Sequence, residues 1–354
     1  MAYGNLNVDT VTTSTPQGVL GAGNSSIMKN RIINGAMVID QRNAGASVTA
    51  TDAGYTLDRW QTFSGAASKF TVQQTTTAPT GFNNSLKVTS SSAYTAGAGE
   101  AFSVNQNIEG YNVADLGFGT ANAKTITISF WVQSSLTGTF SAAIRNSAAN
   151  RSYPFTYTIS SANTWTQASV TIAGDTTGTW LTTNGIGLAL IFNLGSGSNF
   201  LGTAGAWNSN FNTGATGSVS IVGTNGATFY ITGVQLEVGS SATGFEYRQY
   251  GQELALCQRY YLGGTTTSSG WAVATNTTRT PITFPVTMRA SPTISSSGGA
   301  IQYGPGGSTT VSYGTNVQGG SASSSIDMVV GGTPFTSNSP TVAITVSIQV
   351  SAEL

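Results

Sequence analysis

The side chains able to carry catalysis are few in this chain, and almost all of them are carboxylates. The sequence contains no histidine, which excludes Ser-His-Asp and Cys-His catalysis and most zinc sites. A glycosidase needs only two carboxylates about 5–10 Å apart, so it is the one enzyme class that the composition permits. The candidate acids, none of them paired in a recognisable motif, are Asp40, Asp52, Asp58, Glu100, Glu109 and Asp115.

An isolated acid in a chain this poor in charge is more often the structural partner of an arginine, as we expect for Asp58 beside Arg59. Asp58 and Glu237 are also scattered acids that fall far short of the ~6–8 oxygens around a bound calcium ion. Cys257 is the only cysteine, which excludes an intrachain disulfide, and its apolar setting favours a buried side chain. We therefore predict no enzyme, no metal and no other cofactor.

Aromatic side chains near amides form the second group of candidates, because aromatic rings often mark binding sites and can stack on sugars. Trp131 lies opposite the apolar face of its expected strand, and Trp165 follows Asn163 at the start of another. Trp207 and Phe211 lie in a Gly/Ser/Asn-rich segment, 195–217. We predict glycan contacts for these four aromatic residues. The alternative is packing under a second sheet, the loop or another subunit, since tryptophan is usually mostly buried.

The composition restricts the class of protein further. Charged residues make up 7% of the 354 residues, and the formal net charge is zero. A chain with this balance has no excess of positive charge that would attract nucleic acid or an anionic membrane. The N-terminus has neither a basic start nor an apolar core, so we expect no secretory signal, and no apolar run approaches the ~20 residues that span a membrane.

Short apolar-polar alternations separated by turn residues recur along the chain, which is typical of a β-sandwich or jelly roll. The clearest alternation covers 125–132, and another covers 229–238 with a break at Gly233 that suggests a β-bulge. We expect 32–45 to form a strand and a turn, 257–262 to form a strand, and 195–217 to form a long loop. The one helix candidate is the short segment 109–116.

These patterns predict that the chain is divided into three parts. Residues 1–29 form an extended arm with few apolar side chains, of which Leu6, Val8 and Val11 alternate loosely as an added strand would. Residues 30–250 form a large jelly roll or β-sandwich, and 251–354 form a smaller β-sandwich domain. A disordered tail is the alternative for the arm.

Several motifs carry a resemblance to a known family. The segments ITISFWVQSS, NTWTQASVTIAG and TFYITGVQLEVGSSATGFE are similar, in order and spacing, to strand motifs of the carbohydrate-binding-module type of jelly roll. NRIINGAMVIDQR followed by YTLDRW resembles the opening of such domains in bacteriophage tail fibres and other virion appendages. LALCQRYYL with FPVTMRASPTIS looks like the terminal domain that often follows them. The resemblance implies a homotrimeric virion component whose arm is fixed to the particle.

We therefore expect a non-catalytic phage structural protein, a tail-fibre-like appendage that attaches to the host surface. Its expected partners are itself and, through Leu6, Val8 and Val11, other virion proteins, with a host-surface glycan as a further candidate. It would be made in the host cytoplasm and end in the virion. A capsid decoration protein or head fibre, a tail or neck piece, and a polysaccharide-degrading tailspike with paired carboxylates are the alternatives.

Overall fold

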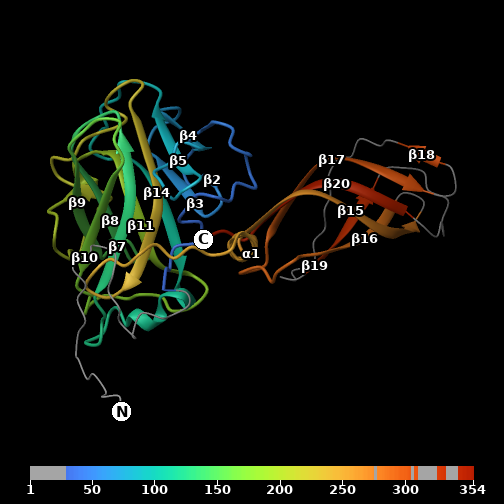
Figure 1. Ribbon diagram of the computed structural model, residues 1–354. Helices are drawn as coiled ribbons and strands as arrows, with labels where there is room; N and C mark the ends of the chain where they lie inside the picture. The colour runs from blue at the N-terminus through green and yellow to red at the C-terminus, as the bar shows by residue number, and fades with distance from the viewer. Residues whose placement is uncertain (1–28, 275–276, 304–306, 310–324, 332–341) are drawn as a thin grey trace, which may run out of the picture.

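The computed structural model describes residues 29–274, 277–303, 307–309, 325–331 and 342–354 (Figure 1). The expected arm, with Leu6, Val8 and Val11, lies outside the described residues except for Lys29. The described chain is almost entirely β-structure, and its larger part is a sandwich of two antiparallel sheets. This confirms the expected all-β class with a jelly-roll-like sandwich.

Two six-stranded sheets face each other in the sandwich. Sheet A has the strand order β1 (Val48–Thr49), β4 (Phe70–Thr75), β5 (Ser85–Ser90), β14 (Thr228–Val238), β7 (Ile126–Ser134) and β10 (Thr166–Ile172). Sheet B has the order β2 (Tyr55–Leu57), β3 (Trp60–Ser64), β6 (Ala101–Glu109), β11 (Ile186–Ser196), β8 (Gly138–Arg145) and β9 (Ser152–Ile159). Strands far apart in sequence are therefore neighbours, as β5, β14 and β7 show.

The core lies between the sheets and follows the period-two alternation of the strands. In β7, the inward-facing Ile126, Ile128, Phe130 and Val132 are at most 1% exposed. Each such side chain contributes about 1.5–3 kcal/mol when it is fully removed from water. Because alternate residues of β7 face inward, Trp131 must face outward, and this periodicity determines where the aromatic candidates lie.

The bulge expected in β14 is confirmed. The pairing of β14 with β7 shifts register between Thr232 and Gln235, and Gly233 has a φ of 61°. This left-handed conformation favours glycine. The bulge allows Ile231 and Val234, three residues apart, both to face the core.

The structure corrects four local expectations, two of them at expected strands. The segment 32–40 contains no strand, because Asn34 and Met37 take left-handed conformations with φ of 57° and 58°. The expected strand at 257–262 is replaced by helix α1 (Tyr250–Gln258) and the start of β15 at Tyr261. Glu, Leu, Ala and Gln are good helix formers, and their propensity outweighs the short apolar alternation there.

The other two corrections concern the expected loop at 195–217 and the helix candidate at 109–116. The segment 195–217 is not a plain loop, because it holds the 3-10 helix η3 (Ser198–Phe200) and a parallel pair of short strands, β12 (Leu201–Gly202) and β13 (Gly214–Ala215). The helix candidate at 109–116 forms two 3-10 turns, η1 (Gly110–Asn112) and η2 (Ala114–Leu116). Gly117, with a φ of 64°, ends the second turn.

The C-terminal strands form a third sheet beyond α1. Its order is β18 (Gly307–Thr309), β17 (Thr293–Tyr303), β20 (Val342–Ser351), β15 (Tyr261–Ala274), β16 (Thr277–Thr283) and β19 (Ser325–Gly331). This sheet lies to one side of the sandwich, and both α1 and the chain end marked C lie where the two parts meet (Figure 1). The long strand β15 pairs with β20 along its first part and with β16 along its last part.

Candidate functional site

The outer face of sheet A carries a group of partly exposed aromatic side chains that we call the aromatic platform. Its members come from three strands or their ends, from the turn before β5 and from the segment after β14; they are Phe82, Trp131, Trp165, Tyr230, Phe245 and Tyr247. Trp131 and Tyr230 face outward because their neighbours Val132 and Ile231 point into the core. Trp131 faces Thr232 across the ladder, so the platform lies along β14 and β7.

Three of the platform rings pack directly on one another. The ring centroids of Phe82 and Phe245 are 5.1 Å apart, those of Phe82 and Tyr247 are 5.5 Å apart, and those of Phe245 and Tyr247 are 4.9 Å apart. The Tyr247 hydroxyl donates a hydrogen bond to the Gly81 carbonyl at 2.8 Å. The Phe82–Phe245 and Phe245–Tyr247 pairs are edge to face, and such packing contributes about 0.5–1.5 kcal/mol per pair. It fixes the rings while Tyr247 remains 61% exposed.

Gly233 connects this cluster to Trp131. A Cβ atom at Gly233 would lie 2.6 Å from Cζ of Phe82 and 3.1 Å from Cδ1 of Trp131. Both rings therefore rest against the backbone of the bulge, and only a residue without a side chain leaves room for them. The bulge in β14 thus positions two rings of the platform.

Polar groups border the rings on the same face. The Trp165 and Tyr230 rings lie 6.2 Å apart, and the Lys87 ammonium lies 5.8 Å from the Tyr230 ring centroid. Gln133 pairs with Tyr230 across the ladder, and the exposed Gln167 pairs with Trp131. Oε1 of Gln133 is buried and accepts no hydrogen bond within the described residues, and Nε2 donates to the Asn163 carbonyl at 2.6 Å. The surface combines flat aromatic rings with amide groups.

The other two predicted aromatic residues lie elsewhere. Trp207 packs at an edge of the sandwich among Phe118, Tyr153 and Trp180, and its Nε1 donates to the Ala173 carbonyl at 2.8 Å. Its surroundings are those of a packing residue.

Phe211 lies over sheet B instead. Its ring contacts those of Phe63 and Phe200 at centroid distances of 6.5 Å and 5.3 Å, and the Arg145 guanidinium lies 4.9 Å from its centroid. The structure therefore brings Trp131 and Trp165 to one face and separates Trp207 and Phe211 from them. Tyr230 could have been found from the alternation of β14, whereas Phe82, Phe245 and Tyr247 have no periodic signal.

Five of the six candidate acids accept structural hydrogen bonds. Asp40 accepts bonds from the backbone amides of Asn43 and Gly45, at 2.9 Å and 2.7 Å. Glu100 accepts bonds from the Tyr94 hydroxyl and the Gly97 amide, and Asp58 accepts one from the Gln41 amide. Asp115 pairs with Arg31. Glu109 pairs with Arg259 and accepts a bond from the Tyr260 hydroxyl. Asp52 lies in an exposed turn and has no polar partner among the described residues.

The expected pairing of Asp58 with Arg59 is wrong, because Arg59 turns toward the end of the chain. Arg59 and Arg42 both bind the Glu353 carboxylate, the latter at 2.7 Å. Burial is the largest single effect on the pKa of the Arg59 guanidinium and lowers it, but the charge of Glu353 together with Tyr260, Tyr55 and Cys257 outweighs burial, and the net shift is upward. The Asp58 carboxylate instead accepts two hydrogen bonds from Gln41.

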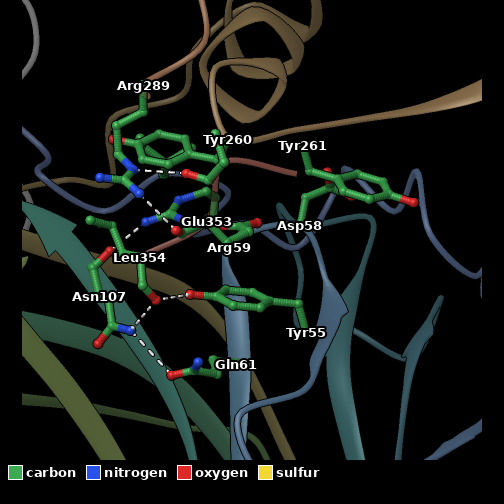
Figure 2. A network of polar contacts seen from close by, with 12 residues as sticks. Tyr55, Asp58, Arg59, Gln61, Asn107, Tyr260, Tyr261, Arg289, Glu353 and Leu354 are labelled. Atoms are coloured by element: carbon green, nitrogen blue, oxygen red, sulfur yellow. Dashed lines mark hydrogen bonds and ion pairs between the residues drawn. The ribbon is translucent and has the colours of Figure 1, made fainter. Parts of the chain in front are cut away.

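These contacts belong to a polar junction between the sandwich and the third sheet (Figure 2). The Leu354 carbonyl accepts hydrogen bonds from the Tyr55 hydroxyl at 2.7 Å and from Nδ2 of Asn107 at 3.2 Å. Arg289 donates to the Ala352 and Glu353 carbonyls at 2.7 Å and 2.8 Å. Tyr55, Asn107 and Arg289 therefore bind the backbone of residues 352–354 at this junction.

No group of three or more His, Cys, Asp or Glu residues that could hold a metal ion occurs in the described ranges. Within the same ranges, no helix has the length and apolar character needed to cross a membrane.

No protein-family model and no curated protein matches the chain. Among solved structures, it is similar to the enzymatically active domain of tailspike protein 4 from bacteriophage CBA120, with 16% identity and a TM-score of 0.31 over 60% of this chain and 22% of that one. The match thus spans less than a quarter of the tailspike chain.

Two carbohydrate-binding modules are similar at a comparable level. The family 11 module from Clostridium thermocellum matches with 13% identity and a TM-score of 0.28, over 57% of this chain and 100% of the module. The CBM22-1 xylan-binding domain from Paenibacillus barcinonensis Xyn10C matches with 11% identity and a TM-score of 0.25, over 57% and 99%. Likenesses at this level concern the β-fold and carry no argument about ligand or activity.

Proposed function

We propose that the protein is a non-catalytic structural component of a phage virion, a tail-fibre-like appendage that attaches to host-surface glycans through the aromatic platform. The observation that carries the proposal is the platform itself, in which Trp131, Trp165 and their neighbours lie on one outer face beside Gln133 and Gln167. Aromatic rings offer flat apolar surface to sugar rings, and amides donate to and accept from sugar hydroxyls.

The bonding of the candidate acids supports a non-catalytic role. A general acid needs a carboxyl group that can reach its substrate and exchange a proton with it. The buried Glu109 is bound to Arg259 and Tyr260, and Asp40 is bound to backbone amides. Both acids are thus committed to structural contacts, and a polysaccharide-degrading tailspike is the alternative that an assay for released reducing ends tests.

The assignment to a virion rests on the order of the sequence motifs that resemble phage appendage proteins. In this proposal, residues 1–29 fix the protein to the particle, and a homotrimer covers part of the charge-poor surface. We expect light scattering of the purified protein to give a trimeric mass. A monomeric mass would contradict the trimer without affecting the platform.

The first experiment compares the full chain with a variant lacking residues 1–29, on intact host cells and on emptied particles. Trp131→Ala and Trp165→Ala test the platform, and Tyr111→Ala is the matched control, because Tyr111 is 62% exposed on η1, outside the platform. We expect the platform variants alone to lose binding to cells and the truncated chain alone to lose binding to particles. If no variant bound to cells and every variant except the truncated one bound to particles, the protein would be a decoration or connector protein instead.

Incubation of host polysaccharide with the protein tests the enzymatic alternative. We expect no release of reducing ends. A steady release that is lost on substitution of one of the candidate acids would overturn the non-catalytic assignment.

A further inference from the structure

Lys87 carries an unpaired positive charge on the outer face of sheet A. Among the residues of the six strands of this sheet, two are charged, Lys87 and Glu237. Glu237 is buried and accepts hydrogen bonds from the amide and the hydroxyl of Thr243. Glu246, in the segment after β14, accepts one from the Asn30 amide. Lys87 forms no hydrogen bond and no ion pair within the described residues, so its charge has no counter-charge on this face.

The other cations with described side chains differ from Lys87 in this respect. Each of the arginines binds a carboxylate or at least one backbone carbonyl. Lys29 donates to a hydroxyl and a carbonyl, and Lys124 pairs with an aspartate at 3.7 Å. Lys69 lies 4.1 Å from the ring centroid of Tyr94, and its charge attracts a nearby glutamate. The ammonium of Lys87 is therefore the one most available to an anion from outside the chain.

Lys87 lies in one row with residues of the aromatic platform. Across neighbouring strands, Lys87 pairs with Tyr230, and Tyr230 pairs with Gln133. Trp165 comes directly before β10, the strand beyond β7, and its ring lies 6.2 Å from that of Tyr230. Neighbouring strands are about 4.8 Å apart, so the row from Lys87 to Trp165 is roughly 14 Å long. A row of this length fits a chain of several sugars better than a single one.

The row is open to solvent along its length. Lys87 faces outward because its neighbours Leu86 and Val88 are buried in the core, and every residue of the row is partly exposed. The Lys87 ammonium lies 5.8 Å from the Tyr230 ring centroid, close to the limit of about 6 Å for cation–π attraction. This contact is too long to occupy the three N–H donors of the ammonium, which can therefore reach a ligand.

We propose that the glycan bound by the aromatic platform is negatively charged and places an anionic group at Lys87. The rings of Tyr230 and Trp165 contact sugar faces, and the ammonium donates to the oxygens of a carboxylate, phosphate or sulfate group. The acids of this face do not oppose the anion, because Glu237 is buried and already hydrogen-bonded. The inference rests on the proposed function, since it names the class of glycan for the same surface.

The test uses purified host-surface polysaccharide in three forms, with the full-length protein in calorimetric titrations. One form is untreated, one has its carboxylates reduced to alcohols, and one has its phosphate and sulfate esters removed. We expect one treated form to bind about 2–5-fold more weakly than the untreated one, as for the loss of a single exposed ion pair. The treatment that has this effect identifies the anionic group. Lys87→Met should bind all three forms with the affinity of that weaker form.

Salt and a reversal of charge test the same contact in two further ways. Raising the ionic strength from 0.01 M to 1 M shortens the screening length from roughly 30 Å to roughly 3 Å. This change should weaken binding of the untreated polysaccharide to wild type and leave binding to Lys87→Met unaltered. Lys87→Glu should bind the untreated form more weakly than the treated one, because the new carboxylate repels the anion. Lys87→Arg keeps the charge and should keep the wild-type preference.

Lys124→Met is the matched control, because it removes an exposed cation elsewhere and should keep the wild-type preference. Since Lys87 is partly exposed, its variants should melt at the wild-type temperature. Equal affinity of wild type for all three forms, or an unchanged preference in Lys87→Met, would overturn the inference about charge. If that binding were still lost in Trp131→Ala, glycan binding by the platform would stand. No binding of any form would overturn both proposals.

Discussion

The aromatic platform and the polar junction are built in opposite ways. The platform consists of rings that pack largely edge to face and remain partly exposed, with the Lys87 ammonium 5.8 Å from the Tyr230 ring centroid. The junction holds buried charges, such as the Arg59–Glu353 pair, in which the two side chains are 1% and 7% exposed. The comparison indicates that buried ion pairs such as Arg59–Glu353 fasten two parts of this charge-poor protein, whereas the platform offers mainly aromatic surface for contact with a ligand or partner.

Substitution at the junction should have the largest effect on stability. Arg59→Met leaves the buried Glu353 with Arg42 alone, and breaking a buried ion pair typically costs about 3–5 kcal/mol. We expect the free energy of unfolding, measured in urea, to fall by that amount. The matched control is Arg31→Met, whose partner Asp115 is 45% exposed, so the loss should stay below about 1 kcal/mol. Equal losses in the two variants would contradict the difference between buried and exposed pairs.

Asp58 should give the junction a distinctive dependence on pH. Burial raises the pKa of this carboxyl to about 6, although the hydrogen bonds from Gln41 oppose the shift. Because the folded pKa lies above the unfolded value of 3.8, the folded state binds the proton more tightly, and ionisation above pH 6 destabilises it. The contribution of Asp58 to stability should therefore rise by about 3 kcal/mol as the pH falls from 7 to below 4.

The measurement compares wild type with Asp58→Asn in urea at pH 7.5 and at pH 5. An amide cannot ionise, so the difference in unfolding free energy between the two proteins should change with pH in favour of wild type at the lower value. A difference that stays constant between the two pH values would show that Asp58 ionises normally in the folded protein.

Gly233→Ala should disturb the platform from within. The new methyl group would meet the Phe82 ring at 2.6 Å, and the φ of 61° disfavours any side chain. We expect a loss of about 1–3 kcal/mol in unfolding free energy and weaker binding to host cells. Gly244→Ala is the control, because no atom lies within 4 Å of the added carbon. If Gly233→Ala folded as stably as this control, the bulge would not be what positions the rings.

Trp131→Ala should have the smallest effect on stability and a large effect on binding. Trp131 is partly exposed and faces away from the core, so we expect the unfolding free energy to change by no more than about 1 kcal/mol. Binding to host cells should fall at least about tenfold, as for loss of a central aromatic contact. Loss of the trimer in light scattering, with binding per subunit preserved, would assign the platform to subunit packing.

Much of the fold follows from local sequence patterns, but only part of the candidate site does. The alternation at 125–132 correctly predicted a strand whose apolar residues face inward, and therefore predicted that Trp131 faces outward. The same reasoning failed at 257–262, where a short apolar pattern fits a strand and a buried helix equally well. It also failed at 32–40, where Asn34 and Met37 take left-handed conformations.

The sequence by itself determined the period-two faces of the strands, the glycine at the bulge and the absence of histidine chemistry. Only the tertiary structure decided which faces meet. Phe82 contacts Tyr247, and Arg59 binds Glu353, 294 residues further along the chain. Alternation assigns a side chain to one face of a strand, but strand order, register and the path of the covering segments decide what that face contacts. For this reason Trp131 and Trp165 came together on sheet A, while Trp207 and Phe211 did not join them.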